Sequence, residues 1–197
     1  MPDSEKRVRA FIAVRVSDEI EASLDALIAR VRAERDGVAW VRPSNLHLTL
    51  KFLGAAVDPA KISQLIGLLH SLAESIAPFE IRVGGIGAFP NFSRPYVIWA
   101  GLESEPLVAL AAQVDEVAAE CGFEREGRRF SPHLTLGRVR NPRLTRDLRE
   151  QLRAVREREF GVSGVQSMTL YRSELAPGGS IYTALATFPF AAAHLKE

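Results

Sequence analysis

The tetrapeptide HLTL occurs twice in this chain of 197 residues, starting once at His47 and once at His133. In each copy polar and apolar residues alternate, which is the pattern of a strand with one buried face. Each histidine should therefore share the polar face with the threonine two residues later, Thr49 or Thr135, while the leucines enter a core. Any fold of this chain must provide two such half-buried strands.

The elements around the two copies recur in the same order. In each half, the residue pattern predicts a strand, a helix, the HLTL strand, a second helix and a further strand. Corresponding elements are offset by 85–88 residues, which indicates an internal duplication. The expected strands are 8–16, 46–53, 79–84, 96–101, 132–139, 165–172 and 181–188, and the expected helices are 18–36, 59–72, 106–121 and 144–157.

The duplication predicts one domain made of two pseudo-symmetric lobes, at approximately 1–90 and 91–197. No stretch between them has the composition of a flexible linker. The pattern leaves open an exchange of terminal strands between the lobes. If a pseudo-twofold axis relates the lobes, the two polar strand faces meet across a cleft and form one four-residue site.

The charge balance limits the kind of partner. The 25 Lys and Arg residues against 24 Asp and Glu give a net charge of +1, which argues against a general coat for nucleic acids. A local basic segment surrounds the second HLTL, with Glu126 as its one carboxylate. Its arginines are Arg125, Arg128, Arg129, Arg138, Arg140, Arg143 and Arg146. Such a cluster is either a solvated face or a site for an anion.

The single cysteine, Cys121, excludes an internal disulfide framework and a zinc site with several cysteines. No stretch reaches 18 consecutive apolar residues, and the start of the chain lacks the apolar core of a signal peptide. We therefore expect a cytoplasmic protein that has no contact with membranes, and we expect it to be a monomer.

Two histidines on facing strands suit phosphate chemistry. Imidazole has an unperturbed pKa of about 6.5, so one ring can act as a base while the other acts as an acid near neutral pH. Hydrolysis of a phosphodiester needs both roles, and it also needs donors to the non-bridging oxygens. Thr49 and Thr135 could supply hydroxyl donors, and an arginine such as Arg138 could add a bidentate cation.

Two other interpretations of the histidines compete with this one. A single His-x-Thr is usually part of an ordinary half-exposed strand, but a repeat kept for packing would explain only the leucines. A metal would need a third ligand, and neither motif has a carboxylate within two residues of its histidine. The other histidines, His70 and His194, lie outside any ligand-like spacing. We therefore expect no metal and no cofactor.

The stretch "GGIGAFPNFSRP" at 84–95 is rich in glycine but matches neither a dinucleotide-binding nor a P-loop pattern, so we expect a loop over the cleft. Several aromatic residues near the predicted strands are candidates for stacking on a base, or for the core. They are Trp40, Phe89, Phe92, Tyr171 and Tyr182. Phe89 and Tyr182 are the two that we predict to bind substrate.

Taken together, these motifs resemble the 2H phosphoesterase superfamily, and within it the bacterial and archaeal RNA 2′,3′-cyclic phosphodiesterases, historically called 2′-5′ RNA ligases. The resemblance covers nearly the whole chain. It is carried by "RVRAFIAV" at the start, "WVRPSNLHLTLKFLG" at 40–54, "GIGAFPNFSRPYVIWAG" at 85–101, "FSPHLTLGRVR" at 130–140 and "LYRSELAPGGSIYTAL" at 170–185.

The resemblance implies a bilobal α+β fold in which two antiparallel sheets face a central cleft, with helices on the outside. It implies opening of 2′,3′-cyclic phosphates to 2′-phosphates without a metal, with His47 as proton donor and His133 as proton acceptor. Thr49, Thr135 and Arg138 are implied as phosphate contacts. Simple alternation from His133 places Arg138 on the core side, so its role requires a bulge in the strand.

Three functions follow as hypotheses. The first is hydrolysis of 2′,3′-cyclic phosphates at RNA ends or in cyclic nucleotides. The second is reversible 2′–5′ ligation of RNA, because the same two histidines serve the reverse displacement. The third is a non-catalytic protein that binds RNA ends, which the retention of both histidines disfavours.

Overall fold

The computed structural model describes residues 7–34, 36–140, 144–177 and 179–191. Arg143 and His194, both named above, lie outside this part of the chain. Within it, four α-helices and nine strands form an α+β fold, which confirms the predicted class. None of the helices in these ranges is long and apolar enough to cross a membrane.

The strands are β1 (Val8–Val14), β2 (Val38–Trp40), β3 (Leu48–Val57), β4 (Phe79–Phe89), β5 (Val97–Glu103), β6 (His133–Val139), β7 (Glu159–Val165), β8 (Ser167–Ala176) and β9 (Gly179–Pro189). The helices are α1 (Asp18–Val31), α2 (Pro59–Glu74), α3 (Glu105–Glu120) and α4 (Arg146–Ala154), with a 3₁₀ turn η1 (Pro43–Asn45). Two strands, β2 and β7, were not predicted, and α1 and α4 end earlier than predicted.

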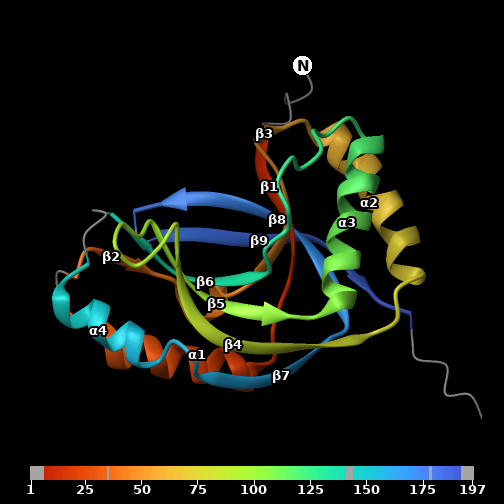
Figure 1. The fold of residues 1–197 in the computed structure, drawn as a ribbon. Helices are drawn as coiled ribbons and strands as arrows, with labels where there is room; N and C mark the ends of the chain where they lie inside the picture. Colours follow the sequence, from red (N-terminus) through yellow and green to blue (C-terminus); the bar gives the residue numbers. More distant parts are fainter. Residues whose placement is uncertain (1–6, 35, 141–143, 178, 192–197) are drawn as a thin grey trace, which may run out of the picture.

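The strands form two antiparallel sheets. One sheet has the order β3-β1-β8-β9, and the other has the order β2-β6-β5-β4-β7 (Figure 1). Each sheet therefore combines strands from both halves of the sequence, because β4 pairs with β5 while β8 pairs with β1. The strand β3 also contacts β6, so the two HLTL strands meet where the sheets adjoin.

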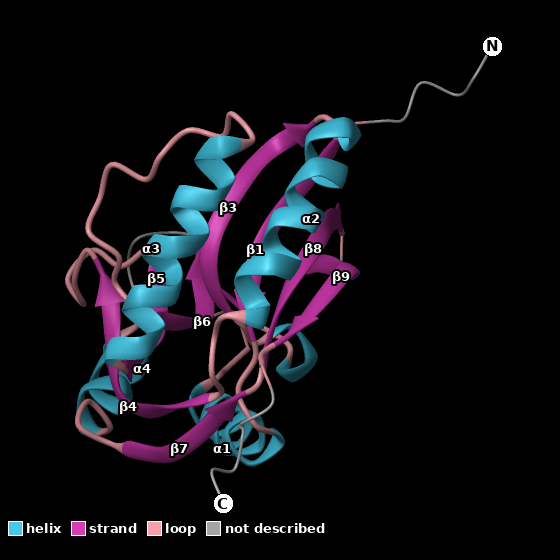
Figure 2. Ribbon diagram, turned by 90° about the vertical axis from the view of Figure 1, so that its right-hand side faces the viewer, coloured by secondary structure: helices cyan, strands magenta, loops and turns pink. Residues whose placement is uncertain are grey.

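The helices also cross between the sheets. Helices α2 and α3 lie side by side over the β3-β1-β8-β9 sheet, where α3 contacts β3 and α2 contacts β9 (Figure 2). Helices α1 and α4 contact β7 and β4 of the other sheet. Helix α1 follows β1 in the chain but packs on the other sheet, and α3 follows β5 but packs on the sheet that contains β1. This reciprocal crossing ties the two sheets into one unit.

Local sequence explains where the helices form. Helix α2 begins with Pro59 in its first turn, after Asp58, whose carboxylate accepts from the backbone N–H of Ala60 at 2.9 Å. Ser17 occupies the N-cap of α1, although its side chain makes no capping bond. Each helix buries residues three or four apart, as an amphipathic helix must. In α3 these are Leu107, Leu110, Ala111, Val114 and Ala118.

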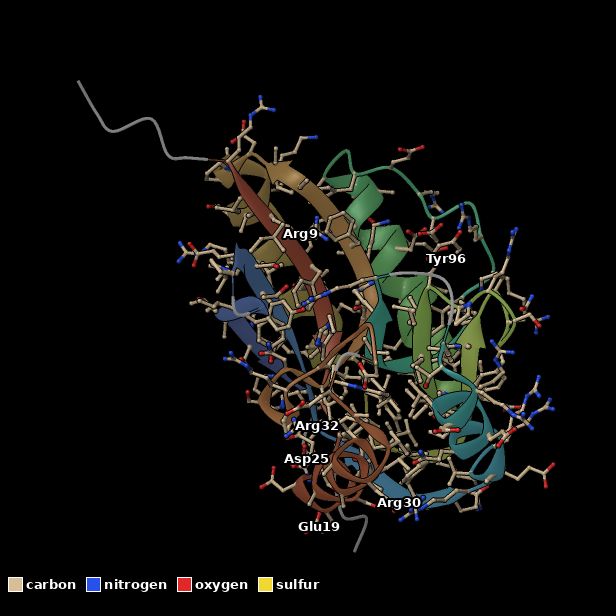
Figure 3. All side chains as sticks on the ribbon, turned by 90° about the vertical axis from the view of Figure 1, so that its left-hand side faces the viewer. Arg9, Glu19, Asp25, Arg30, Arg32 and Tyr96 are labelled. Carbon is tan, nitrogen blue, oxygen red and sulfur yellow. The ribbon has the colours of Figure 1, made fainter. Side chains whose placement is uncertain are left out.

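A bulge in β3 changes which side chains are buried. Alternation predicts Lys51 on the polar face and Phe52 in the core, but Lys51 is 7% exposed and Phe52 is 47% exposed. Adjacent residues of β1 pair with Thr49 and Lys51, so Leu50 is an extra residue that shifts the alternation. The exposed Phe52 ring lies under the guanidinium of Arg9, 4.4 Å from its centroid (Figure 3).

The glycine-rich stretch 84–95 is not mainly a loop, so the prediction above is wrong for its first half. Residues 84–89 belong to β4 and pair with β5. The ring of Trp99 lies over Gly87, where an added Cβ would approach a ring carbon to 2.1 Å. Here glycine serves close packing inside a strand, which an aromatic neighbour on the next strand requires.

The buried Lys51 holds the segment that leads toward β6. Its Nζ donates to Asp115 of α3 at 2.5 Å and to the carbonyl of Glu124 at 2.7 Å. The same Asp115 oxygen accepts from the N–H of Glu126 at 3.0 Å. Partial burial raises the pKa of Asp115, but these donors outweigh it and hold the pKa below its ordinary value.

Replacing Lys51 with methionine should lower the free energy of unfolding by about 3 kcal/mol at pH 7, because Asp115 loses its buried partner. Since the folded pKa of Asp115 is lowered, its stabilising contribution exists above the unfolded pKa and disappears as the pH falls through the folded value. In acid, urea denaturation should therefore show that the substitution lowers the free energy of unfolding by less than it does at pH 7.

Arg146→Met is the matched control, because its ion pair with Glu150 is exposed and should contribute little. Equal losses for the two variants at pH 7 would contradict the buried-pair interpretation.

Candidate active site

The two histidines of the HLTL motifs lie at equivalent places. His47 immediately precedes β3, and His133 is the first residue of β6. These strands contact each other, and the charge of His133 acts on His47. The structure therefore brings together two imidazoles that are 86 residues apart in the sequence.

Both rings are held by the same hydrogen bond. The Nδ1 of His47 lies 2.7 Å from the carbonyl oxygen of Asn45, and the Nδ1 of His133 lies 2.8 Å from that of Ser131. A carbonyl oxygen only accepts, so Nδ1 carries a hydrogen in both rings. This fixes the tautomer and leaves each Nε2 available to take or give a proton.

Burial is the main cause of a lowered pKa at His47. The Asn45 carbonyl opposes this shift, because it stabilises the protonated ring. The positive charges of Arg138, Arg15 and His133 reinforce it. The ligand-free site therefore favours neutral His47, and an anion placed among these charges would favour the protonated form.

Matched bulges set the orientation of residues beyond the threonines. Ile98 and Trp99 are adjacent in β5, and they pair with Gly137 and Thr135 of β6. Leu136 is therefore an extra residue without a partner in β5, as Leu50 is without a partner in β1. This is the bulge that the role of Arg138 requires. It returns Arg138 to the face of Thr135, where the guanidinium is exposed and acts on His47.

Aromatic rings surround both imidazoles. The ring of Tyr182 meets His47 edge-on at 5.0 Å, and Phe11 lies 4.8 Å from the same imidazole. Phe89 meets His133 edge-on at 5.0 Å and lies 5.2 Å from Trp99. The structure thus places Phe89 and Tyr182, the two predicted aromatics, directly at the histidines.

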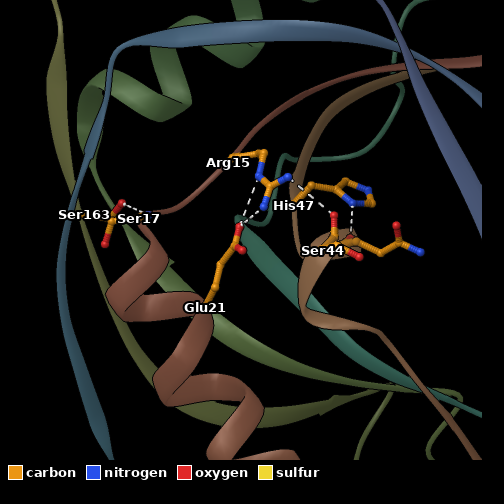
Figure 4. A network of polar contacts seen from close by, with 7 residues as sticks. Arg15, Ser17, Glu21, Ser44, His47 and Ser163 are labelled. Carbon is orange, nitrogen blue, oxygen red and sulfur yellow. Dashed lines mark hydrogen bonds and ion pairs between the residues drawn. The ribbon is translucent and has the colours of Figure 1, made fainter.

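Arg15 is a site residue that the sequence did not single out. Its guanidinium bonds Glu21 of α1, at 3.1 Å from Nε, and reaches the carbonyl of Ser44 at 3.5 Å (Figure 4). The pKa of Arg15 is raised, first by its hydrogen bond to Glu21. This pairing fixes a permanent cation beside His47.

Phe11 and Trp99 are two further site residues that were not predicted, although the repeat in the sequence indicates both. They are 88 residues apart, which is the offset of the duplication, and they lie on the corresponding strands β1 and β5. Trp99 is paired directly with Thr135, and Phe11 contacts His47. Searching the repeat for aromatic residues would have found both.

The remaining aromatic candidates have other surroundings. Trp40 donates from Nε1 to Asp36 at 2.8 Å and packs beside Gly137, so it supports β6. Tyr171 is paired with Phe11 across β1 and β8 and stacks on its ring, on the same face of the sheet. In the described part of the chain, no group of three His, Cys, Asp or Glu side chains lies close enough to hold a metal ion.

Comparison with known proteins agrees with this geometry. The family model of the 2'-5' RNA ligase superfamily matches residues 16–174. A Methanothermobacter thermautotrophicus protein named RNA 2',3'-cyclic phosphodiesterase is 35% identical over 183 residues, which cover 92% of this chain and 98% of that protein. One of the same name from Archaeoglobus fulgidus is 36% identical over 182 residues, covering 92% and 99%.

Solved structures show the same fold. TT0787 of Thermus thermophilus superposes with a TM-score of 0.80 and 33% identity, covering 94% of this chain and all of that chain. Escherichia coli LigT complexed with 3'-AMP gives a TM-score of 0.76 and 27% identity, covering 93% and 98%. The chain therefore belongs to the 2'-5' RNA ligase superfamily, and the predicted family resemblance is confirmed.

Removing a positive charge near His47 should raise the pKa of its imidazole. We expect this for both Arg138→Gln and Arg15→Gln, because each cation disfavours protonation of the ring. The measurement is an NMR titration of the His47 imidazole in the ligand-free protein. Arg125→Gln, from the same basic segment but paired with Glu116, is the control and should leave the midpoint in place. A lower midpoint in either test variant would refute the electrostatic account.

Proposed function

We propose that this protein hydrolyses 2′,3′-cyclic phosphates at RNA ends, or in cyclic nucleotides, to 2′-phosphates. The observation that carries the proposal is the matched presentation of His47 and His133, each with Nδ1 bound to a backbone carbonyl and Nε2 available. Relatives named RNA 2',3'-cyclic phosphodiesterase, aligned over nearly their full length, support the same reaction.

In the proposed step, a water oxygen attacks the phosphorus of the cyclic phosphate while Nε2 of His133 accepts a proton from that water. The bond between phosphorus and the 3′-oxygen breaks, and His47 donates a proton from Nε2 to that oxygen. The product carries a 2′-phosphate and a 3′-hydroxyl. One acid and one base thus complete the displacement.

Thr49, Thr135 and Arg138 hold the phosphate in this scheme. The hydroxyls donate to non-bridging oxygens, and the guanidinium neutralises charge that develops on them. Arg138 is suited to this because, in the described part of the chain, no carboxylate pairs with it. Each proton transfer is assigned to a side chain, so the scheme needs no metal.

The lowered pKa of His47 gives substrate binding a second consequence. Neutral His47 cannot act as the acid, but a phosphate anion between Arg138 and the two imidazoles offsets the charges that disfavour its protonation. We therefore propose that the substrate itself recruits the proton that His47 later donates. Binding of an anionic nucleotide near neutral pH should then take up protons from the buffer.

His47→Ala and His133→Ala should each lower kcat/KM on 2′,3′-cyclic AMP at least ~10²-fold, the usual worth of a general acid or base. His70→Ala is the matched control, because that ring packs on Phe188 outside the site, and its rate should stay near wild type. The wild-type rate should survive EDTA and follow a bell-shaped pH profile. Loss of activity in EDTA, or a fully active His133→Ala enzyme, would refute the proposal.

The family also carries the name of RNA ligases, and the same histidines serve ligation if a 5′-hydroxyl replaces water as the nucleophile. Products from RNA halves with a cyclic phosphate and a 5′-hydroxyl separate the two reactions. We expect a terminal 2′-phosphate to predominate over a 2′–5′ linkage.

A further inference from the structure

A cavity of about 590 Å³ lies beside the histidine site and plays no part in the chemistry described so far. Its walls combine aromatic rings and arginines. The residues used below are Gly87, Phe92, Trp99, Arg153 and Arg156. We call this cavity the Trp99 groove.

The Trp99 groove is continuous with the catalytic face. Trp99 is paired directly with Thr135 on the neighbouring strand, and directly paired residues project from the same face of a sheet. Phe89 bridges the two places, because its ring contacts both His133 and Trp99. Trp99 itself forms part of the floor, because its ring lies over Gly87, which has no side chain.

The charge of the Trp99 groove favours an anion. No aspartate or glutamate lines it. Arg153 and Arg156 are both exposed, and neither guanidinium has a hydrogen-bond or ion-pair partner among the described residues. Arg156 also borders a smaller cavity that Glu103, Glu157 and Glu159 line, but among the described residues it forms an ion pair with none of them.

The groove presents an aromatic surface next to its cations. Trp99 and Phe92 both line it, and neither residue is fully buried. Together, aromatic rings and two unpaired arginines are what a single-stranded nucleotide requires.

The span of the groove fits an RNA chain that leaves the histidines. The strand order leads from β6 through β5 to β4, and the N–H of Ile86 in β4 then bonds the carbonyl of Arg156. Three neighbouring-strand spacings amount to about 14 Å between Thr135 and the Arg156 backbone.

We propose that the Trp99 groove binds the RNA nucleotide on the 5′ side of the cyclic-phosphate end. Its base stacks on the aromatic wall formed by Trp99 and Phe92, and its phosphate lies between Arg153 and Arg156. This inference rests on the proposed function, and it adds a binding place for the nucleotide that precedes the cyclic-phosphate end.

The test compares two substrates, 2′,3′-cyclic AMP and a triadenylate that ends in a 2′,3′-cyclic phosphate. The wild type should favour the triadenylate roughly tenfold in kcat/KM, and the double variant R153Q/R156Q should lose most of that preference. The salt slope of log kcat/KM on the triadenylate should also become shallower by about 0.7 for each lost phosphate contact.

Arg30→Gln removes another exposed cation, one that does not line the Trp99 groove, and should keep the wild-type preference. A wild-type ratio near one, or an unchanged ratio in R153Q/R156Q, would overturn the inference. If the wild type cleaves neither substrate, the proposed function fails instead. Binding then decides the inference: R153Q/R156Q must weaken a 2′-phosphorylated triadenylate relative to 2′-AMP, and equal weakening refutes it.

Discussion

Two imidazoles that serve one phosphate must lie close together, yet they repel each other whenever both are protonated. In this protein burial is the main cause that lowers the pKa of His47, and the positive charges of Arg138, Arg15 and His133 lower it further. The aromatic residues Phe11 and Tyr182 maintain the burial, and the Asn45 carbonyl limits the shift. The arrangement is therefore poised to gain a proton when an anion arrives.

Several features of the fold hold β3 against β6. The crossing of α1 and α3 between the sheets, and the exchange of β4 and β8, mean that neither sheet can form without both halves of the chain. The buried Lys51–Asp115 pair fastens β3 to the segment that precedes β6. Matched bulges at Leu50 and Leu136 then give both strands the same change of face after the threonine. The contact between β3 and β6 thus brings the two halves of the site together.

The sequence predicted those parts of the structure that depend on local periodicity. The core faces of the helices, the two HLTL strands and the four His and Thr positions all follow from spacings of two, three or four residues. The resemblance to the 2H phosphoesterases supplied Arg138, which needed a bulge that local alternation could not provide. Phe89 and Tyr182 were chosen as aromatic residues near strands, and both lie at the histidines.

Features set by long-range pairing were missed or wrong. Lys51 and Phe52 exchange faces because of how β3 pairs with β1, and 84–89 is a strand because it pairs with β5. Strand β7 is half exposed and contains two glycines, so it has little apolar pattern to detect. Arg153 and Arg156 lie on and after a short surface helix. Only the tertiary structure places them beside the catalytic face.

The central claim is that both histidines bind a single phosphate through Nε2. The most direct measurement is NMR of the protein labelled with ¹⁵N in histidine, during titration with 2′-AMP. Both Nε2 resonances, of His47 and His133, should shift with one shared Kd at one ligand per chain, while both Nδ1 atoms remain protonated. Two different Kd values, or a response from only one of the two rings, would contradict the account.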